Sequence, residues 1–78
     1  MKMYLKLARI GMNMEEATIS RWHKKPGDSF KAGEILYEIE TEKISQEIEA
    51  TEDGRMLEIC VPEGEDAQVG EHLCLVEV

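Results

Sequence analysis

The sequence is short of basic residues, and the shortage limits the kinds of partner this protein can have. Only 9 Lys and Arg residues oppose 17 Asp and Glu residues, so the formal net charge is −8. This balance argues against nucleic acid or an anionic membrane surface as a partner and favours a basic protein surface. Most of the carboxylates are interpreted as solubilising charges, with Glu40 and Glu42 as the exceptions.

Cysteine and histidine are equally scarce. Cys60 and Cys74 have no metal-ligand spacing and are too few for a disulfide framework. We therefore expect two reduced thiols in the core of an intracellular protein. His23 and His72 lack a Ser or Cys partner pattern and a metal-ligand spacing, so both are interpreted as surface residues. No catalytic or metal site is expected.

Membrane and signal segments are not expected either, because Lys2, Lys6 and Arg9 interrupt the apolar residues of the first ten positions. With one Trp, one Phe, two Tyr and 42% hydrophobic residues, the chain has the composition of one soluble domain, residues 1–78, with an aliphatic core. We expect Trp22 to pack in or against that core, with its indole N–H donating to an acceptor.

The residues that are present alternate between apolar and polar at the period of a β-strand, and no segment has a helical period. Strand patterns cover residues 3–10, 18–23, 35–40 and 44–50, and in the third we expect Ile35, Tyr37 and Ile39 to face the core. Residues 24–28 have turn chemistry, and residues 12–17 are interpreted as a surface loop. At least six strands and no helix predict an all-β domain.

The two halves of the sequence repeat each other at an offset of 37 residues. Gly27 aligns with Gly64 and Gly33 with Gly70, and an acidic residue follows each of the four. This pattern favours a duplication, and two copies of a four-stranded motif predict a sandwich of two four-stranded sheets with pseudo-two-fold symmetry. The symmetry places the middle of the chain at one end of the domain and both termini at the other.

Lys43 lies at this midpoint, in the segment Glu40-Thr41-Glu42-Lys43 between two predicted strands. The join is interpreted as a short hairpin whose tip holds the side chains of Thr41, Glu42 and Lys43 in water. An ordinary solvated turn lysine is the usual interpretation of such a residue. The central position in the repeat and the flanking carboxylates favour a functional lysine here.

The chain resembles the lipoyl domains of dihydrolipoyl acyltransferase components of 2-oxo-acid dehydrogenase complexes. The resemblance runs from about Leu5 to the last residue and is carried by these motifs: Gly11-Met12-x-Met14-Glu15-Glu16, Thr18-Ile19-x-x-Trp22, Gly27-Asp28, Gly33-Glu34, Ile39-Glu40-Thr41-Glu42-Lys43, Glu49-Ala50, Gly54 and Val69-Gly70. The sequence departs from the family pattern in having Glu42 for Asp, Ala8 for Pro and Ala17 for Gly. The last two bear on loop shape near Lys43.

The resemblance implies a flattened β-barrel of two four-stranded antiparallel sheets with lipoic acid joined by an amide bond to Lys43. It implies that Glu40, Thr41 and Glu42 at the tip are recognised by a lipoate ligase or lipoyl transferase. It also implies that a loop beside the tip is recognised by partner enzymes, and that loop contains Gly11, Met12, Asn13, Met14, Glu15 and Glu16. From composition alone, Met12 and Met14 are more often core filler than recognition groups.

The implied function is that of a carrier. A lipoyl-lysine arm would move acyl groups and electrons between a thiamine-dependent 2-oxo-acid decarboxylase, the acyltransferase catalytic domain and dihydrolipoyl dehydrogenase. The chain itself would not be an enzyme. The implied compartment is the bacterial cytoplasm, or the mitochondrial matrix after loss of a transit peptide.

Three alternatives remain open. A biotinyl carrier has a similar fold, but its lysine typically lies between two methionines, and the string Met1-Lys2-Met3 lies at the terminus and not at the hairpin. An unmodified barrel-sandwich module would serve only for protein interaction, and the Glu-Thr-Glu-Lys tip argues against it. A glycine-cleavage carrier protein is usually longer and has added helical segments.

Overall fold

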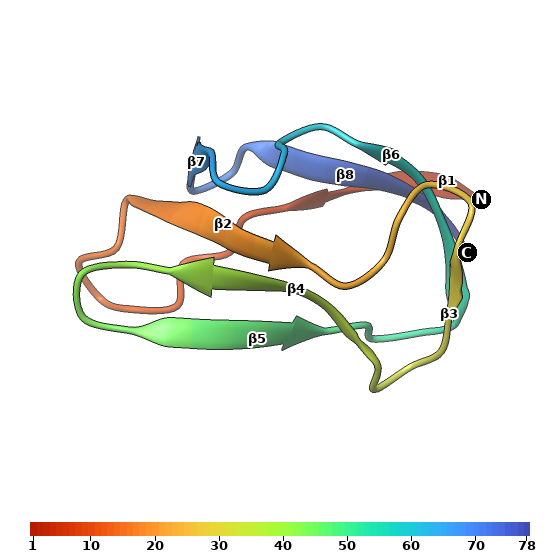
Figure 1. Ribbon diagram of the computed structural model, residues 1–78, viewed down its shortest axis with the longest axis horizontal. Helices are drawn as coiled ribbons and strands as arrows, with labels where there is room; N and C mark the ends of the chain where they lie inside the picture. The colour runs from red at the N-terminus through yellow and green to blue at the C-terminus, as the bar shows by residue number, and fades with distance from the viewer.

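The computed structural model describes residues 1–78 and contains eight β-strands and no helix (Figure 1). Pairing is antiparallel throughout and gives two four-stranded sheets, with strand orders β1-β8-β6-β3 and β5-β4-β2-β7. The two sheets do not close into a true barrel. The strands are β1 (Lys2–Lys6), β2 (Glu16–Trp22), β3 (Ser29–Phe30), β4 (Ile35–Glu40), β5 (Ser45–Glu49), β6 (Gly54–Ile59), β7 (Asp66–Gln68) and β8 (His72–Glu77). The predicted fold class is confirmed.

The second four strands repeat the first four. Strands β1, β8, β6 and β3 of one sheet correspond in order to β5, β4, β2 and β7 of the other, and the members of each pair are four strands apart in the chain. β4 and β8 differ by the 37 residues of the sequence repeat. The turns repeat as well, because the amide of Gly27 donates to the Met56 carbonyl at 2.7 Å and the amide of Gly64 donates to the Ile19 carbonyl at 2.7 Å. Each half therefore supplies the acceptor for a turn of the other, and the structure repeats at the offset that the glycines predict.

The core lies between the sheets and consists of 15 buried residues, all of them hydrophobic. Leu36 and Tyr37 are adjacent in β4 and both are buried, so the alternation expected for that strand is wrong at Leu36. The pairing of β4 with β5 has a bulge between Ile35 and Tyr37, and a bulge lets two successive side chains lie on the same side. The same arrangement recurs in β8, where Leu73 and Cys74 are both buried.

The expectation that both cysteines lie in the core is wrong for Cys60, which is exposed, and correct for Cys74. Ile59 is paired directly with Cys74, so their side chains share a face of the sheet. Cys60 is the next residue along and lies on the other side of the sheet. The first strand is also shorter than predicted, because it ends at Lys6 and the chain then crosses towards the other sheet.

Trp22 packs against the core as expected. Its indole Nε1 donates to the Val61 carbonyl at 2.9 Å, and its ring lies 5.0 Å from that of Tyr37 at an angle of 49°. The side chain thereby anchors the segment that follows β6 to the end of β2. An aromatic residue with one polar donor suits this half-buried position.

The two chain termini meet at one end of the domain, and the β4–β5 hairpin lies at the other (Figure 1). The Met1 ammonium donates to the Val78 carbonyl at 2.7 Å, and the Val78 amide donates back to the Met1 carbonyl at 2.8 Å. The prediction that the termini lie together, opposite the midpoint of the chain, is confirmed.

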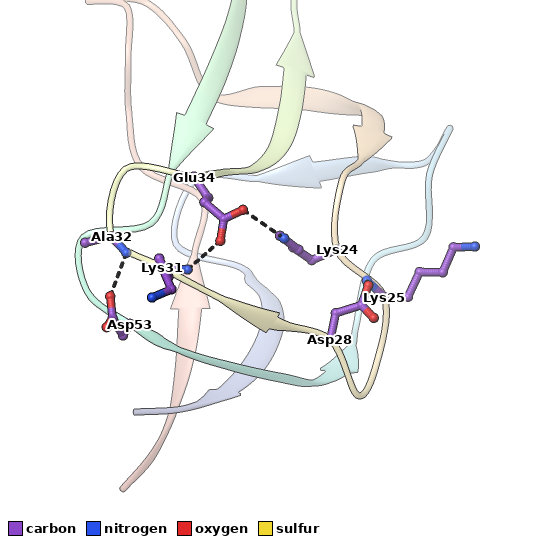
Figure 2. A network of polar contacts seen from close by, with 7 residues as sticks. All are labelled: Lys24, Lys25, Asp28, Lys31, Ala32, Glu34 and Asp53. Atoms are coloured by element: carbon purple, nitrogen blue, oxygen red, sulfur yellow. Dashed lines mark hydrogen bonds and ion pairs between the residues drawn. The ribbon is translucent and has the colours of Figure 1, made fainter.

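A polar network ties together the turns around β3 near this terminal end (Figure 2). Glu34 accepts hydrogen bonds from the Lys31 amide at 2.7 Å and from Lys24 Nζ at 3.1 Å, while Asp53 accepts one from the Ala32 amide at 2.9 Å. The backbone hydrogen bond from Lys31, followed by that from Lys24, lowers the pKa of the Glu34 carboxyl. The charges at this end support turns of the fold.

Candidate functional site

Lys43 lies at the tip of the β4–β5 hairpin. Glu40 and Ser45 form the last pair of the ladder, and the Thr41 amide then donates to the Ile44 carbonyl at 2.8 Å. Only Glu42 and Lys43 stand beyond this bond, and both are exposed. The structure therefore places Lys43 where the alternation of its flanking strands predicts it.

Thr41 is only partly exposed, so the expectation that its side chain lies freely in water is wrong. Its hydroxyl oxygen accepts hydrogen bonds from the amides of Lys43, at 3.3 Å, and of Ile44, at 3.1 Å. Thr41 is thus part of the turn itself.

The Lys43 amine is available for chemistry. The structure has two side-chain ion pairs, His23 with Glu38 and Lys24 with Glu34, and Lys43 takes part in neither. An unpaired amine at an exposed hairpin tip is open to an acylating enzyme, and an amide bond formed there would carry its group away from the core. The residues present therefore fit a covalently attached arm.

The predicted recognition loop lies beside this tip. An open groove is lined by all ten residues that the sequence singled out: Gly11, Met12, Asn13, Met14, Glu15, Glu16, Glu40, Thr41, Glu42 and Lys43. The loop is fixed at both ends, because the Met14 amide donates to the Gly11 carbonyl at 3.1 Å and the Val69 amide donates to the Glu15 carbonyl at 2.9 Å. Segments about 30 residues apart in the sequence thus form one surface.

The two methionines of the loop differ sharply. Met12 is 88% exposed, whereas Met14 is 8% exposed and belongs to the hydrophobic core. Core filler is therefore the correct interpretation for Met14, while Met12 leaves a large apolar side chain on the groove.

Sequence reasoning missed one wall of the groove. β7 pairs with β2 and adds Asp66 and Gln68 to the lining, and Thr18 Oγ1 donates to Asp66 Oδ1 at 2.5 Å. Arg9 also lines the groove. β7 has three residues, and Asp66 lies 48 positions from its partner Thr18, so the neighbouring sequence does not indicate the pairing. Only the strand order of the structure shows that these residues line the groove.

The groove is acidic. Five carboxylates line it against two basic side chains, Arg9 and Lys43, the five being Glu15, Glu16, Glu40, Glu42 and Asp66. Such a surface attracts a basic partner and raises its rate of encounter. No group of three or more His, Cys, Asp or Glu side chains is arranged to hold a metal ion. The structure likewise contains no helix that could span a membrane.

Comparison with known proteins agrees with this geometry. The biotin/lipoyl family, described as "Biotin-requiring enzyme", matches residues 4–76. The solution structure of the lipoyl domain of the 2-oxoglutarate dehydrogenase complex from Azotobacter vinelandii superposes with a TM-score of 0.81 at 33% identity, covering 96% of this chain and 95% of that one.

Two longer relatives match most of this chain. The dihydrolipoyllysine-residue acetyltransferase component of the acetoin cleaving system of Bacillus subtilis is 40% identical over 70 residues, which is 90% of this chain. The dihydrolipoyllysine-residue succinyltransferase component of the 2-oxoglutarate dehydrogenase complex of Rickettsia conorii is 41% identical over 73 residues, or 94% of this chain. The match spans 18% of the length of each relative. The chain therefore belongs to the biotin/lipoyl family and, within it, is a lipoyl domain.

Proposed function

We propose that Lys43 is the attachment site of lipoic acid and that the domain acts as the carrier of a 2-oxo-acid dehydrogenase complex or a closely related system. The observation that carries this proposal is the unpaired lysine at the exposed hairpin tip of a lipoyl domain, at the end opposite the termini. A site remote from the termini lets an attached arm sweep through solvent while the domain stays tethered elsewhere.

The chain's own residues supply a support for the arm. The lysine stem adds reach, and the hydrogen-bonded hairpin beneath it fixes the point from which the arm moves. Lipoic acid, when attached, supplies a dithiolane that accepts an acyl group and electrons. Tethering raises its effective concentration at each partner without any new contact. The domain contributes no catalytic group of its own to this scheme.

The partners follow from this role. Glu40, Thr41 and Glu42 are proposed as the part of the tip that a lipoate ligase or lipoyl transferase meets, and the Gly11–Glu16 loop as the part that the thiamine-dependent decarboxylase meets. The acyltransferase catalytic domain and dihydrolipoyl dehydrogenase complete the set. The acidic groove supports docking to basic surfaces on these enzymes. The protein would work where such complexes work, in the bacterial cytoplasm or the mitochondrial matrix.

Mass analysis of the chain from cells with active lipoate and biotin ligases tests the proposal. A lipoyl mass on the Lys43 peptide is expected, and Lys43→Arg should remove it while leaving the circular dichroism spectrum and the melting temperature unchanged. A biotin mass on the same peptide would assign the domain to carboxylase carriers. An unmodified chain, with both ligases active on control substrates, would favour a protein-interaction module.

A further inference from the structure

The tip of the β4–β5 hairpin is closed without the positive φ angles that hairpin loops of its length normally use. Only two residues, Glu42 and Lys43, separate Thr41 from Ile44, and hairpin loops of this length normally use turns with positive φ at one or both central residues. Such turns favour Gly, Asn or Asp. No residue other than glycine has positive φ in this structure, so the tip is closed by other means.

The side chain of Thr41 closes the tip. In the usual two-residue hairpin the amide of the closing residue donates to the backbone carbonyl opposite. Here the Ile44 amide donates instead to the Thr41 hydroxyl at 3.1 Å, and the Lys43 amide donates to the same oxygen at 3.3 Å. A threonine hydroxyl that takes the place of a backbone acceptor is a known turn device. It allows Glu42 and Lys43 to keep ordinary backbone conformations.

The opposite end of the domain offers an internal comparison. Strands β8 and β1 pair there as β4 and β5 pair at the tip, and the Val78 amide donates to the Met1 carbonyl at 2.8 Å as the Thr41 amide donates to that of Ile44. There the Met1 ammonium donates to the Val78 carbonyl at 2.7 Å, whereas at the tip the Ile44 amide donates to the Thr41 hydroxyl. The hydroxyl therefore replaces a backbone acceptor only at the tip.

We propose that Thr41 is the positioning residue for modification of Lys43: its hydroxyl fixes the backbone of Lys43, and with it the direction in which the lysine leaves the hairpin. The inference rests on the proposed attachment of lipoic acid at Lys43. A ligase must find the lysine in a defined place relative to the domain. Without the hydroxyl, the Lys43 and Ile44 amides lose their hydrogen bonds and the tip adopts several conformations. The ligase can bind few of these conformations productively.

The test compares Thr41→Val, which keeps the shape without the acceptor, with Thr41→Ser, which keeps the acceptor. Thr51→Val is the matched control, because Thr51 is exposed two residues beyond the other end of β5 and takes part in none of the side-chain hydrogen bonds of the structure. Two quantities are measured: the initial rate of lipoylation by a purified lipoate ligase, and hydrogen exchange of the Lys43 and Ile44 amides by NMR. Melting temperatures verify that every variant is folded.

We expect Thr41→Val to lower the initial rate by about 10-fold, the size expected for losing two exposed hydrogen bonds, and to speed exchange at both amides. Thr41→Ser and Thr51→Val should match the wild type in both measurements. An unchanged rate in Thr41→Val would overturn the inference. So would a slower rate with unchanged exchange, since the hydroxyl would then contact the ligase directly. A wild-type chain that is not lipoylated would instead refute the proposed attachment site, while the exchange data would still report on the turn.

Discussion

Gly33 and Gly70, which are 37 residues apart, adopt the same backbone conformation, with φ of 91° and 90°. Each ends a turn before the long strand of its own half, and each amide donates to a carbonyl of the segment beside it, Gly33 to Ala50 at 2.8 Å and Gly70 to Leu7 at 2.9 Å. The two halves therefore use the same turn conformation and the same kind of backbone hydrogen bond at equivalent positions.

Replacing Gly33 or Gly70 by alanine is expected to destabilise the domain by about 1–2 kcal/mol at either site. A Cβ would meet nothing within 4 Å at either position, so the cost comes from the backbone conformation alone and should be similar at the two sites. Urea melts followed by circular dichroism measure it. The control is Gly11→Ala, where φ is not positive and the nearest atom would lie at 3.9 Å. Equal stability of all three variants would contradict the explanation.

Gly54 differs from Gly33 and Gly70, because glycine is required there by the lack of room for a side chain and not by the backbone conformation. A Cβ there would lie 2.6 Å from the Glu77 carbonyl oxygen, 2.9 Å from the Phe30 ring and 2.9 Å from Val78. Gly54→Ala should therefore cost about 1–3 kcal/mol through steric overlap, in a residue whose φ is ordinary. Truncating the neighbour in a Gly54→Ala/Val78→Ala double variant should recover part of the loss. Full additivity of the two changes would refute the steric explanation.

The sequence predicted the parts of the fold that depend on local chemistry. Alternation placed Lys43 between two strands, and the paired glycines predicted the duplication. Alternation failed where bulges intervene, because a single extra residue moved Leu36 into the core. Cys60 was misplaced because its position depends on how Ile59 pairs with Cys74, which is set by a distant strand.

The candidate site was predictable to the same extent. The tip and the Gly11–Glu16 loop are continuous segments whose motifs are visible in the sequence. Asp66 reaches the groove only because β7 pairs with β2, and Thr41 acts through its hydroxyl on amides two and three residues ahead. The first depends on long-range pairing and the second on a turn geometry that residue type alone does not specify.

Alkaline pH is expected to destabilise the domain. Burial raises the pKa of Cys74 from 9.0 to about 12 and that of Tyr37 from 10.0 to about 12. Between pH 9 and pH 12 the folded state therefore keeps protons that the unfolded chain releases. The free energy of unfolding has its full value below pH 9 and falls as the pH rises towards 12. Each group removes on the order of 1 kcal/mol per pH unit between its unfolded and its folded pKa. Urea midpoints measured from pH 8 to 11 should fall, and Cys74→Ala should fall less steeply.

The two cysteines should differ in reactivity. Cys60 is exposed, but partial burial and the nearby Glu58 raise its pKa, so thiolate is scarce at neutral pH and alkylation should be slow compared with a free cysteine. Cys74 is buried and should react only after unfolding. Iodoacetamide followed by mass analysis is expected to add one label in buffer and two in denaturant. Labelling of Cys74 in the native Cys60→Ser variant would contradict the described packing.

Met12 and Met14 allow the roles of the recognition loop to be separated. Met14 is 8% exposed and lies in the core, so Met14→Ala should destabilise the domain by about 2–4 kcal/mol. Met12 is 88% exposed, so Met12→Ala should leave stability within about 0.5 kcal/mol of the wild type. If the loop meets a partner enzyme, Met12→Ala should nevertheless slow reductive acylation of the lipoylated domain by its decarboxylase. Measuring both variants at a temperature where each is folded distinguishes the two effects. A Met12→Ala domain that is acylated at the wild-type rate would remove the exposed methionine from the docking surface and leave the loop's carboxylates as its remaining candidates.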